Sequence, residues 1–282
     1  MKKFFLKIRA LFLLPVLGMT VACDDWFTLL PQSEMVAEDF WKDEQDVKSA
    51  VGACYRAMLE DGFMRRLIVW GELRSDNVIN GLGTDTEIGY ILNANLNEAN
   101  SYCKWNDFYT VINYCNTMIQ NAPMVRERDA DFTEEDLNHY LAEAKGIRAF
   151  CYFTLARTFK DIPYMETPYV DDTQRFQVEQ TSFENVLDTL ISDLKTVEDV
   201  AVSDYGDTEA YNRGRITQKA IWALVADMSL WRGNYRQCVD YCNKILTTAT
   251  NPLSLLPADT YFNTVFAVSY THLRAHETSQ DL

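Results

Sequence analysis

The feature that most constrains the fold is a helical hydrophobic repeat that returns in several separate segments. Apolar residues recur there at intervals of three and four, which places them on one face of an α-helix. We find no convincing strand-rich region. The clearest segments cover residues 43–58, 105–119, 133–159 and 181–197. Residues 217–248 form a further pair interrupted at Gly233, which predicts two helices joined by a tight turn.

Polar residues stand where these helices are expected to begin. Asp43 and Thr133 precede two of the apolar patterns, and Thr217 opens the last pair. Thr181, followed three residues later by Glu184, has the spacing of a capping box. The sequence therefore predicts where four of the helices begin.

Amphipathic pairs of this kind cannot bury their apolar stripes alone, so neighbouring pairs must stack on one another. Ala220, Trp231, Gly233 and Tyr235 resemble the small, aromatic and glycine positions of a tetratricopeptide repeat. We predict an all-α fold for residues 37–267: a tetratricopeptide-like helical-repeat scaffold with long irregular loops. Residues 71–101, rich in Asn, Gly and Thr, are expected to be such a loop, and long loops are often functional.

The N-terminus has the pattern of a secretion signal. Basic residues in the first nine positions precede an apolar stretch over residues 10–22, which is too short to span a bilayer. Residues 20–25 read Thr-Val-Ala-Cys-Asp-Asp and resemble a bacterial lipobox. The resemblance implies cleavage after residue 22, acyl chains on Cys23, and a tether over residues 23–36. Each buried methylene of such chains contributes roughly 0.8 kcal/mol to membrane binding. The alternative is an ordinary signal peptide with a coincidental cysteine.

The other six cysteines favour a structural role. Cys238 and Cys242 are spaced for one helix face, but no histidine or third cysteine lies nearby, so we expect no metal site. All six fall within apolar helical patterns, where small buried thiols are expected. The remaining four are Cys54, Cys103, Cys115 and Cys151.

The charge balance limits the possible partners. The formal net charge is −15, and residues 1–22 contain basic residues but no acidic ones, so the remainder is more acidic still. A negative field of this size disfavours nucleic acid. It favours a neutral ligand over an anionic one, although a solvated acidic surface is the commoner explanation.

Several blocks, in order, resemble the SusD/RagB family of outer-membrane nutrient-binding lipoproteins. They are spread over residues 23–250 behind the lipobox, and their order makes the resemblance specific. Lys160 departs from the family pattern, which commonly has glycine at that position in the turn. The matching blocks are Cys23–Phe27, Phe40–Trp41, Trp70–Asn77, the helix from Trp105 to Asn116, Ala142–Phe150, Asp161–Pro163 and Asn212–Thr217.

The resemblance implies a lipid-anchored receptor on the outer face of the outer membrane. Such a receptor binds an oligosaccharide, or in some members a peptide, and works with a SusC-like TonB-dependent transporter. No cofactor is implied. Aromatic faces and hydrogen-bonding side chains around the 71–101 loop are the candidate ligand contacts, unless they only pack that loop onto the repeats. These candidates are Trp70, Arg74, Asp76, Asn77, Tyr90 and Tyr102.

Two sites that contain arginine favour a structural role over ligand binding. Arg148 lies on a largely apolar helix and would need a buried acidic partner, for which Glu143 and Asp161 are the candidates. Gly214 between two arginines could form a phosphate nest, but the start of a helix is the better interpretation.

Two other function classes remain as alternatives. A tetratricopeptide-type adaptor lipoprotein would bind another protein and no nutrient, although a lipobox and long loops are unusual for one. A glycoside hydrolase would need two carboxylates placed across a scissile bond. The acidic residues here read as caps and solvated faces, and no nucleophile motif or phosphate loop is present, so we do not expect an enzyme.

The end of the chain differs from the rest. The apolar pattern stops near Phe266, and residues 268–278 resemble a translated sequencing-library adapter. We therefore expect residues 268–282 to be an artefact and the gene to be truncated at this point. His272 and His276 have the spacing of a metal-binding pair, but discounting the tail leaves only His139.

Overall fold

The computed structural model describes residues 40–75, 78–170, 174, 177–206, 209–249, 253 and 255–261. The chain divides into two units, Met1–Trp41 and Lys42–Leu282. In the first unit only Phe40 and Trp41 are described, and their rings meet edge to face at 4.9 Å. The expected signal peptide, Cys23 and its tether lie outside the described residues, as do Asp76, Asn77 and the tail from residue 268.

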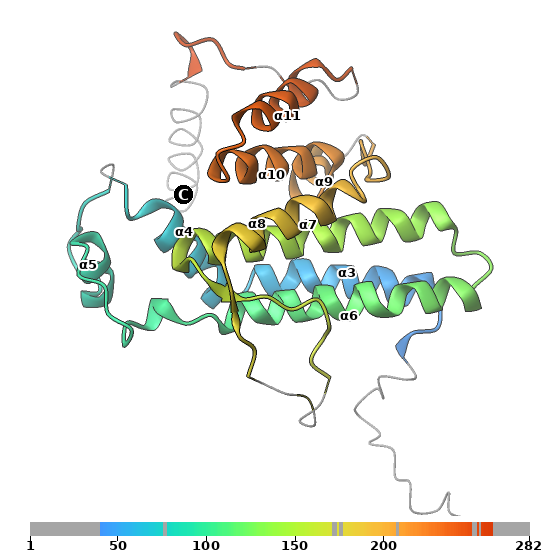
Figure 1. Ribbon diagram of the computed structural model, residues 1–282, viewed down its shortest axis with the longest axis horizontal. Coiled ribbons are helices and arrows are strands. Elements are labelled where there is room, and N and C mark those ends of the chain that lie inside the picture. Colours follow the sequence, from blue (N-terminus) through green and yellow to red (C-terminus); the bar gives the residue numbers. More distant parts are fainter. Residues whose placement is uncertain are drawn as a thin grey trace, which may run out of the picture. The chain divides into compact units, whose positions relative to one another are not determined.

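The second unit is built from helices, which confirms the all-α prediction (Figure 1). In the described residues its only strands are two short ones, β1 (Ile162–Pro163) and β2 (Gln180–Thr181), paired antiparallel with Ile162 opposite Thr181. The helices in chain order are α3 (Glu44–Met58), α4 (Asp61–Glu72), α5 (Thr86–Leu92), the 3-10 turn η2 (Ser101–Cys103), α6 (Asn106–Arg128), α7 (Glu134–Phe159), α8 (Phe183–Lys195), α9 (Glu209–Gly214), α10 (Gln218–Trp231) and α11 (Tyr235–Thr247).

Three of the four predicted helix starts are confirmed. The side chains of Asp43, Thr133 and Thr217 each accept a hydrogen bond from a backbone N–H in the first turn of the helix that follows. The fourth prediction is wrong by one residue, because Ser182 caps α8 and Thr181 lies in β2. Pairing with β1 holds the backbone of Thr181 extended, and the chain turns into the helix only after it.

The core forms around α7, which packs against α3, α6, α8 and α10 (Figure 1). More than half of the residues of α7 are buried, whereas amphipathic α8 and α11 bury one face or less. Gly146 of α7 allows the segment before α10 to approach closely, since an added Cβ would lie 2.6 Å from Ile216 Cγ2. The helices α10 and α11 pack against each other as the predicted repeat pair, joined through Gly233 at φ 77°.

Arg148 is buried and paired, but the predicted partners are wrong. Its Nη2 lies 2.6 Å from Asp193 Oδ2 of α8, and its Nη1 donates to Asn116 Oδ1 at 2.9 Å. Glu143 lies five residues earlier on α7 and so faces a different side of the helix. The carboxylate of Asp161 accepts instead from the backbone N–H of residue 183.

Glu143 anchors a second buried network, which joins α3, α7 and the segment before α10. The Tyr55 hydroxyl donates to Glu143 at 2.7 Å and accepts from the backbone N–H of Ile216 at 2.8 Å. Arg215 pairs with the same carboxylate, and its guanidinium carbon lies 4.1 Å from the centre of the Tyr205 ring. Burial, and then the negative charge of Glu143, raise the pKa of Tyr55 well above its ordinary value. Arg215 therefore serves the scaffold.

The backbone at the turn after α7 and the burial of the cysteines could not be read from the sequence pattern alone. Lys160, which departs from the resembled pattern, adopts φ 70°, a conformation that favours glycine. Three of the cysteines, on α3, α6 and α7, are buried as expected. The expectation of burial is wrong for Cys242, which is exposed, while Cys103 and Cys238 are partly exposed.

Candidate ligand-binding cleft

The segment predicted as a long irregular loop folds back on the end of α4. It is irregular only in part, because it contains α5 and leads into η2. Ile91 of α5 and Tyr102 of η2 form a small apolar core with Val69 of α4. Glu87 strengthens this arrangement because its carboxylate accepts from both the hydroxyl and the backbone N–H of Ser101. These two bonds, the first of them the larger cause, lower the pKa of Glu87.

Two predicted ligand contacts help to hold this segment. The indole N–H of Trp70 donates to the carbonyl oxygen of Tyr102 at 2.8 Å, and the Tyr102 side chain is buried. The Trp70 ring also meets the Phe159 ring edge to face at 5.7 Å. Tyr90 and Arg74 are exposed. Whether any of the predicted residues touches a ligand stays a prediction, and Asp76 and Asn77 lie outside the described residues.

A cleft of about 420 Å³ lies among residues of α4, the end of α7 and the end of α10. Its volume falls within the range of pockets that hold small ligands. It brings Trp70 and Arg74 together, whereas neither Tyr90 nor Tyr102 is among its described lining residues. The lining consists of Leu67, Trp70, Gly71, Glu72, Arg74, Thr154, Arg157, Thr158 and Trp231.

Trp231 is a cleft residue that the sequence did not identify as a candidate. It is the last residue of α10, it is 50% exposed, and its ring forms a T-shaped pair with that of Phe183 at 6.1 Å between ring centres. The sequence pattern assigned it to an aromatic repeat position. Its place before the turn through Gly233 was a signal that it could lie at the end of the stack.

Arg157 is the second residue that the sequence missed. Its guanidinium carbon lies 4.5 Å from the centre of the Phe153 ring, and its Nη1 is 3.6 Å from Asp227 Oδ2. The hydroxyls of Thr154 and Thr158, which also line the cleft, donate to carbonyl oxygens of α7 itself. The cleft thus combines an exposed indole with charged hydrogen-bonding groups, an arrangement that suits a ligand with apolar faces and many polar edges.

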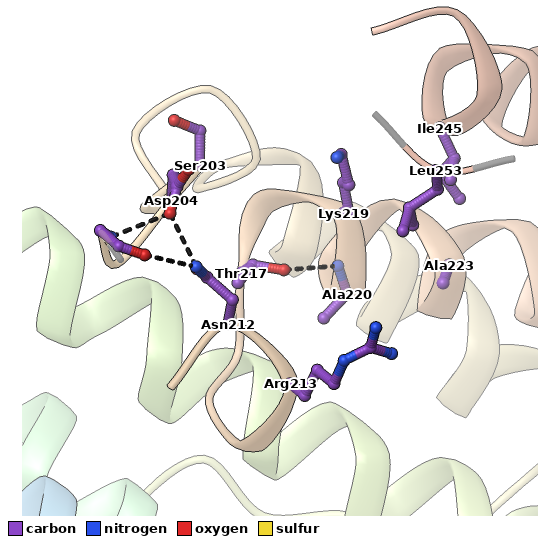
Figure 2. Close-up of a pocket in the computed structure, with 11 residues that line it drawn as sticks. Ser203, Asp204, Asn212, Arg213, Thr217, Lys219, Ala220, Ala223, Ile245 and Leu253 are labelled. Atoms are coloured by element: carbon purple, nitrogen blue, oxygen red, sulfur yellow. Dashed lines mark hydrogen bonds between the residues drawn. The ribbon is translucent and has the colours of Figure 1, made fainter. Parts of the chain in front are cut away.

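A second pocket, of about 490 Å³, lies beside the turn between α9 and α10 (Figure 2). There the Asn212 amide donates to Asp204 Oδ1 at 2.7 Å and to the Gly206 carbonyl at 3.0 Å, and the Thr217 hydroxyl accepts from the backbone N–H of Ala220. These bonds hold the turn together. None of the predicted ligand residues that the structure describes lines this pocket, so we take the cleft at α4 as the candidate site.

The remaining observations concern metals and membranes. Across the described ranges, no group of three or more His, Cys, Asp or Glu side chains is arranged to hold a metal ion. Among the helices of the same residues, none combines the length and apolar character that a membrane span requires.

Comparison with known proteins gives a consistent family. Residues 30–230 match the model of a SusD-like family described as starch-binding and associating with the outer membrane. SusD-like protein P38 of Formosa agariphila is 31% identical over 214 residues, which cover 73% of this chain and 40% of that protein. The chain spans less than half the length of the curated relatives it matches.

Solved structures share the fold. A SusD superfamily protein from Bacteroides thetaiotaomicron superposes with a TM-score of 0.63 at 23% identity, covering 73% of this chain and 47% of that one. A laminarin-binding SusD-like protein superposes with a TM-score of 0.63 at 20% identity, covering 74% and 44%. With its helical scaffold and the family match over residues 30–230, the chain belongs to the SusD-like family of starch-binding proteins that associate with the outer membrane.

Proposed function

We propose that this chain is part of a cell-surface receptor that binds oligosaccharide in the cleft at α4 and passes it to a SusC-like TonB-dependent transporter. The observation that carries the proposal is the exposed indole of Trp231 in a cleft with Trp70 and Arg74, on a scaffold of a glycan-binding family. A solved relative with the same fold is a laminarin-binding protein, which supports a saccharide ligand.

The cleft suits binding without chemical change. The apolar face of a sugar ring can pack on the indole of Trp231, and the side chains of Arg74 and Glu72 can hydrogen-bond to its hydroxyls. Trp70 is fixed by its bond to the Tyr102 carbonyl, so its edge of the cleft is formed before the ligand arrives. We propose a binding protein and no enzyme.

The location follows from the N-terminus. We propose that acyl chains on Cys23 hold the protein on the outer membrane, facing the exterior, because residues 20–25 resemble a lipobox. Radiolabelled palmitate should be incorporated into the wild-type chain in cells and lost in the Cys23→Ser variant. Equal labelling of both would refute the anchor.

The ligand proposal can be tested by titrating the purified chain with a panel of soluble polysaccharides by calorimetry. Trp231→Ala should weaken binding at least tenfold, because it removes the exposed stacking surface, whereas Trp231→Phe should retain part of it. Tyr235→Ala is a matched control, since Tyr235 is an exposed aromatic on the next helix and does not line the cleft.

Two outcomes would contradict the proposal. If Trp231→Ala bound as tightly as the wild type, the cleft would not be the site. If no polysaccharide bound while a periplasmic protein bound tightly, the adaptor alternative would be favoured instead.

A further inference from the structure

The charged side chains that line the cleft indicate which class of glycan it can bind. Arg74 is exposed and makes no hydrogen bond or ion pair with any other residue in the described part of the chain. Among the described residues, nothing neutralises its guanidinium group. Of the described residues that line the cleft, Glu72 is the only acidic one.

Arg157 is held in place but only weakly neutralised. Its ion pair with Asp227 is long, 3.6 Å, and the two side chains are 34% and 45% exposed, so solvent screens it. Contact with the Phe153 ring orients the guanidinium plane. One carboxylate contact leaves most of the five N–H donors of an arginine unused.

The cleft thus presents more donors than acceptors. The hydroxyl groups of Thr154 and Thr158 already donate to backbone carbonyl oxygens of α7. In the described part of the lining, two guanidinium groups then face the single carboxylate of Glu72. A guanidinium matches a planar pair of anionic oxygens and binds it in a bidentate manner, so it suits a carboxylate or a sulfate better than a sugar hydroxyl.

Resting on the proposed function, we infer that the glycan of this cleft is anionic. Arg74 and Arg157 bind a carboxylate or sulfate group on the sugar, and Trp231 takes the face of a sugar ring. The net charge of −15 favours a neutral ligand at long range. At physiological salt, however, exposed charges more than about 8 Å apart are largely screened, so the groups in contact with the ligand decide the preference. The acidic surface only slows the approach of the ligand.

The test compares three oligosaccharides of equal length at fixed salt: an oligogalacturonate, a sulfated galactan fragment and an uncharged laminarin fragment. One anionic oligosaccharide should bind at least tenfold more tightly than laminarin, and which one it is separates the carboxylate from the sulfate. Arg74→Gln and Arg157→Gln should each weaken that binding about tenfold. Glu72→Gln should strengthen it two- to fivefold, because it removes a repelling charge.

Arg65→Gln is the matched control, because Arg65 is an exposed arginine of α4 that pairs with Asp61 and does not line the cleft. Its affinity should stay within twofold of wild type, and circular dichroism should show every variant folded. Tight laminarin binding that neither cleft arginine affects would overturn the inference and leave the proposed function standing. Anionic binding that survives both substitutions would overturn the assignment to this cleft. Failure of all three glycans would refute the proposed function and the inference with it.

Discussion

Replacement of Glu143 by glutamine should destabilise the fold far more than loss of an ordinary ion pair. The carboxylate is buried and lies at 3.0 Å from Arg215 Nε and 2.5 Å from Arg215 Nη2. The Tyr55 hydroxyl donates to it as well. Glutamine preserves the shape and can still accept from Tyr55, so the substitution isolates the charge.

The magnitude follows from the bonds lost. A hydrogen bond to a charged group contributes roughly 1.5–3 kcal/mol, and the substitution weakens both bonds from Arg215. The Arg215 side chain is 30% exposed and can be partly rehydrated, which lowers the total. We expect a loss of about 2–3 kcal/mol of unfolding free energy. Asp188→Asn, which breaks the surface pair with Arg232, should cost much less, because solvent screens that exposed pair.

Urea unfolding followed by circular dichroism measures both variants. The midpoint for Glu143→Gln should fall by about 1 M, with an unchanged slope, and that for Asp188→Asn should hardly move. A double-mutant cycle with Arg215→Gln should give a coupling energy of about 1–3 kcal/mol. Equal costs for Glu143→Gln and Asp188→Asn, or a coupling energy near zero, would refute the view that this network ties the three segments together.

Three further predictions follow from the backbone and the loop. Gly146→Ala should lower the free energy of unfolding by about 1–3 kcal/mol, because the added methyl would lie 2.6 Å from a side-chain carbon. Gly52→Ala, on an open helix face, should raise the free energy of unfolding by about 0.5–1 kcal/mol, and thermal unfolding compares the two variants. Lys160→Gly should raise the melting temperature by relieving strain of roughly 1–3 kcal/mol, less the backbone entropy of glycine, and a lower melting temperature would contradict this. Because hydrogen bonds lower the pKa of Glu87, its contribution to the stability of this segment is present above its ordinary pKa of 4.5 and is lost as pH falls through the lowered value. Hydrogen-exchange protection of residues 86–103 should therefore fall in acid. An equal fall in the Glu87→Gln variant would contradict the assignment to Glu87.

The sequence alone predicted six of the helices and the caps of three of them, but not α4, α5 or α9. Apolar spacing, the caps at Asp43 and Thr133 and the break at Gly233 act over a few residues, so they can be recognised without knowing the fold. The capping of α8 was missed by one position because Thr181 is held by a strand partner 19 positions earlier. The order of the sequence blocks was also sufficient to indicate the family.

Only the tertiary structure decided which side chains meet. Arg148 pairs with Asp193, 45 positions away, and the choice depends on how α8 packs on α7. The cleft likewise joins Trp70, Arg157 and Trp231 from three separate helices. Helical periodicity fixes which face a residue occupies, but the neighbour of that face is set by packing between distant segments. The physical reason is that the first depends on local backbone geometry and the second on long-range contacts.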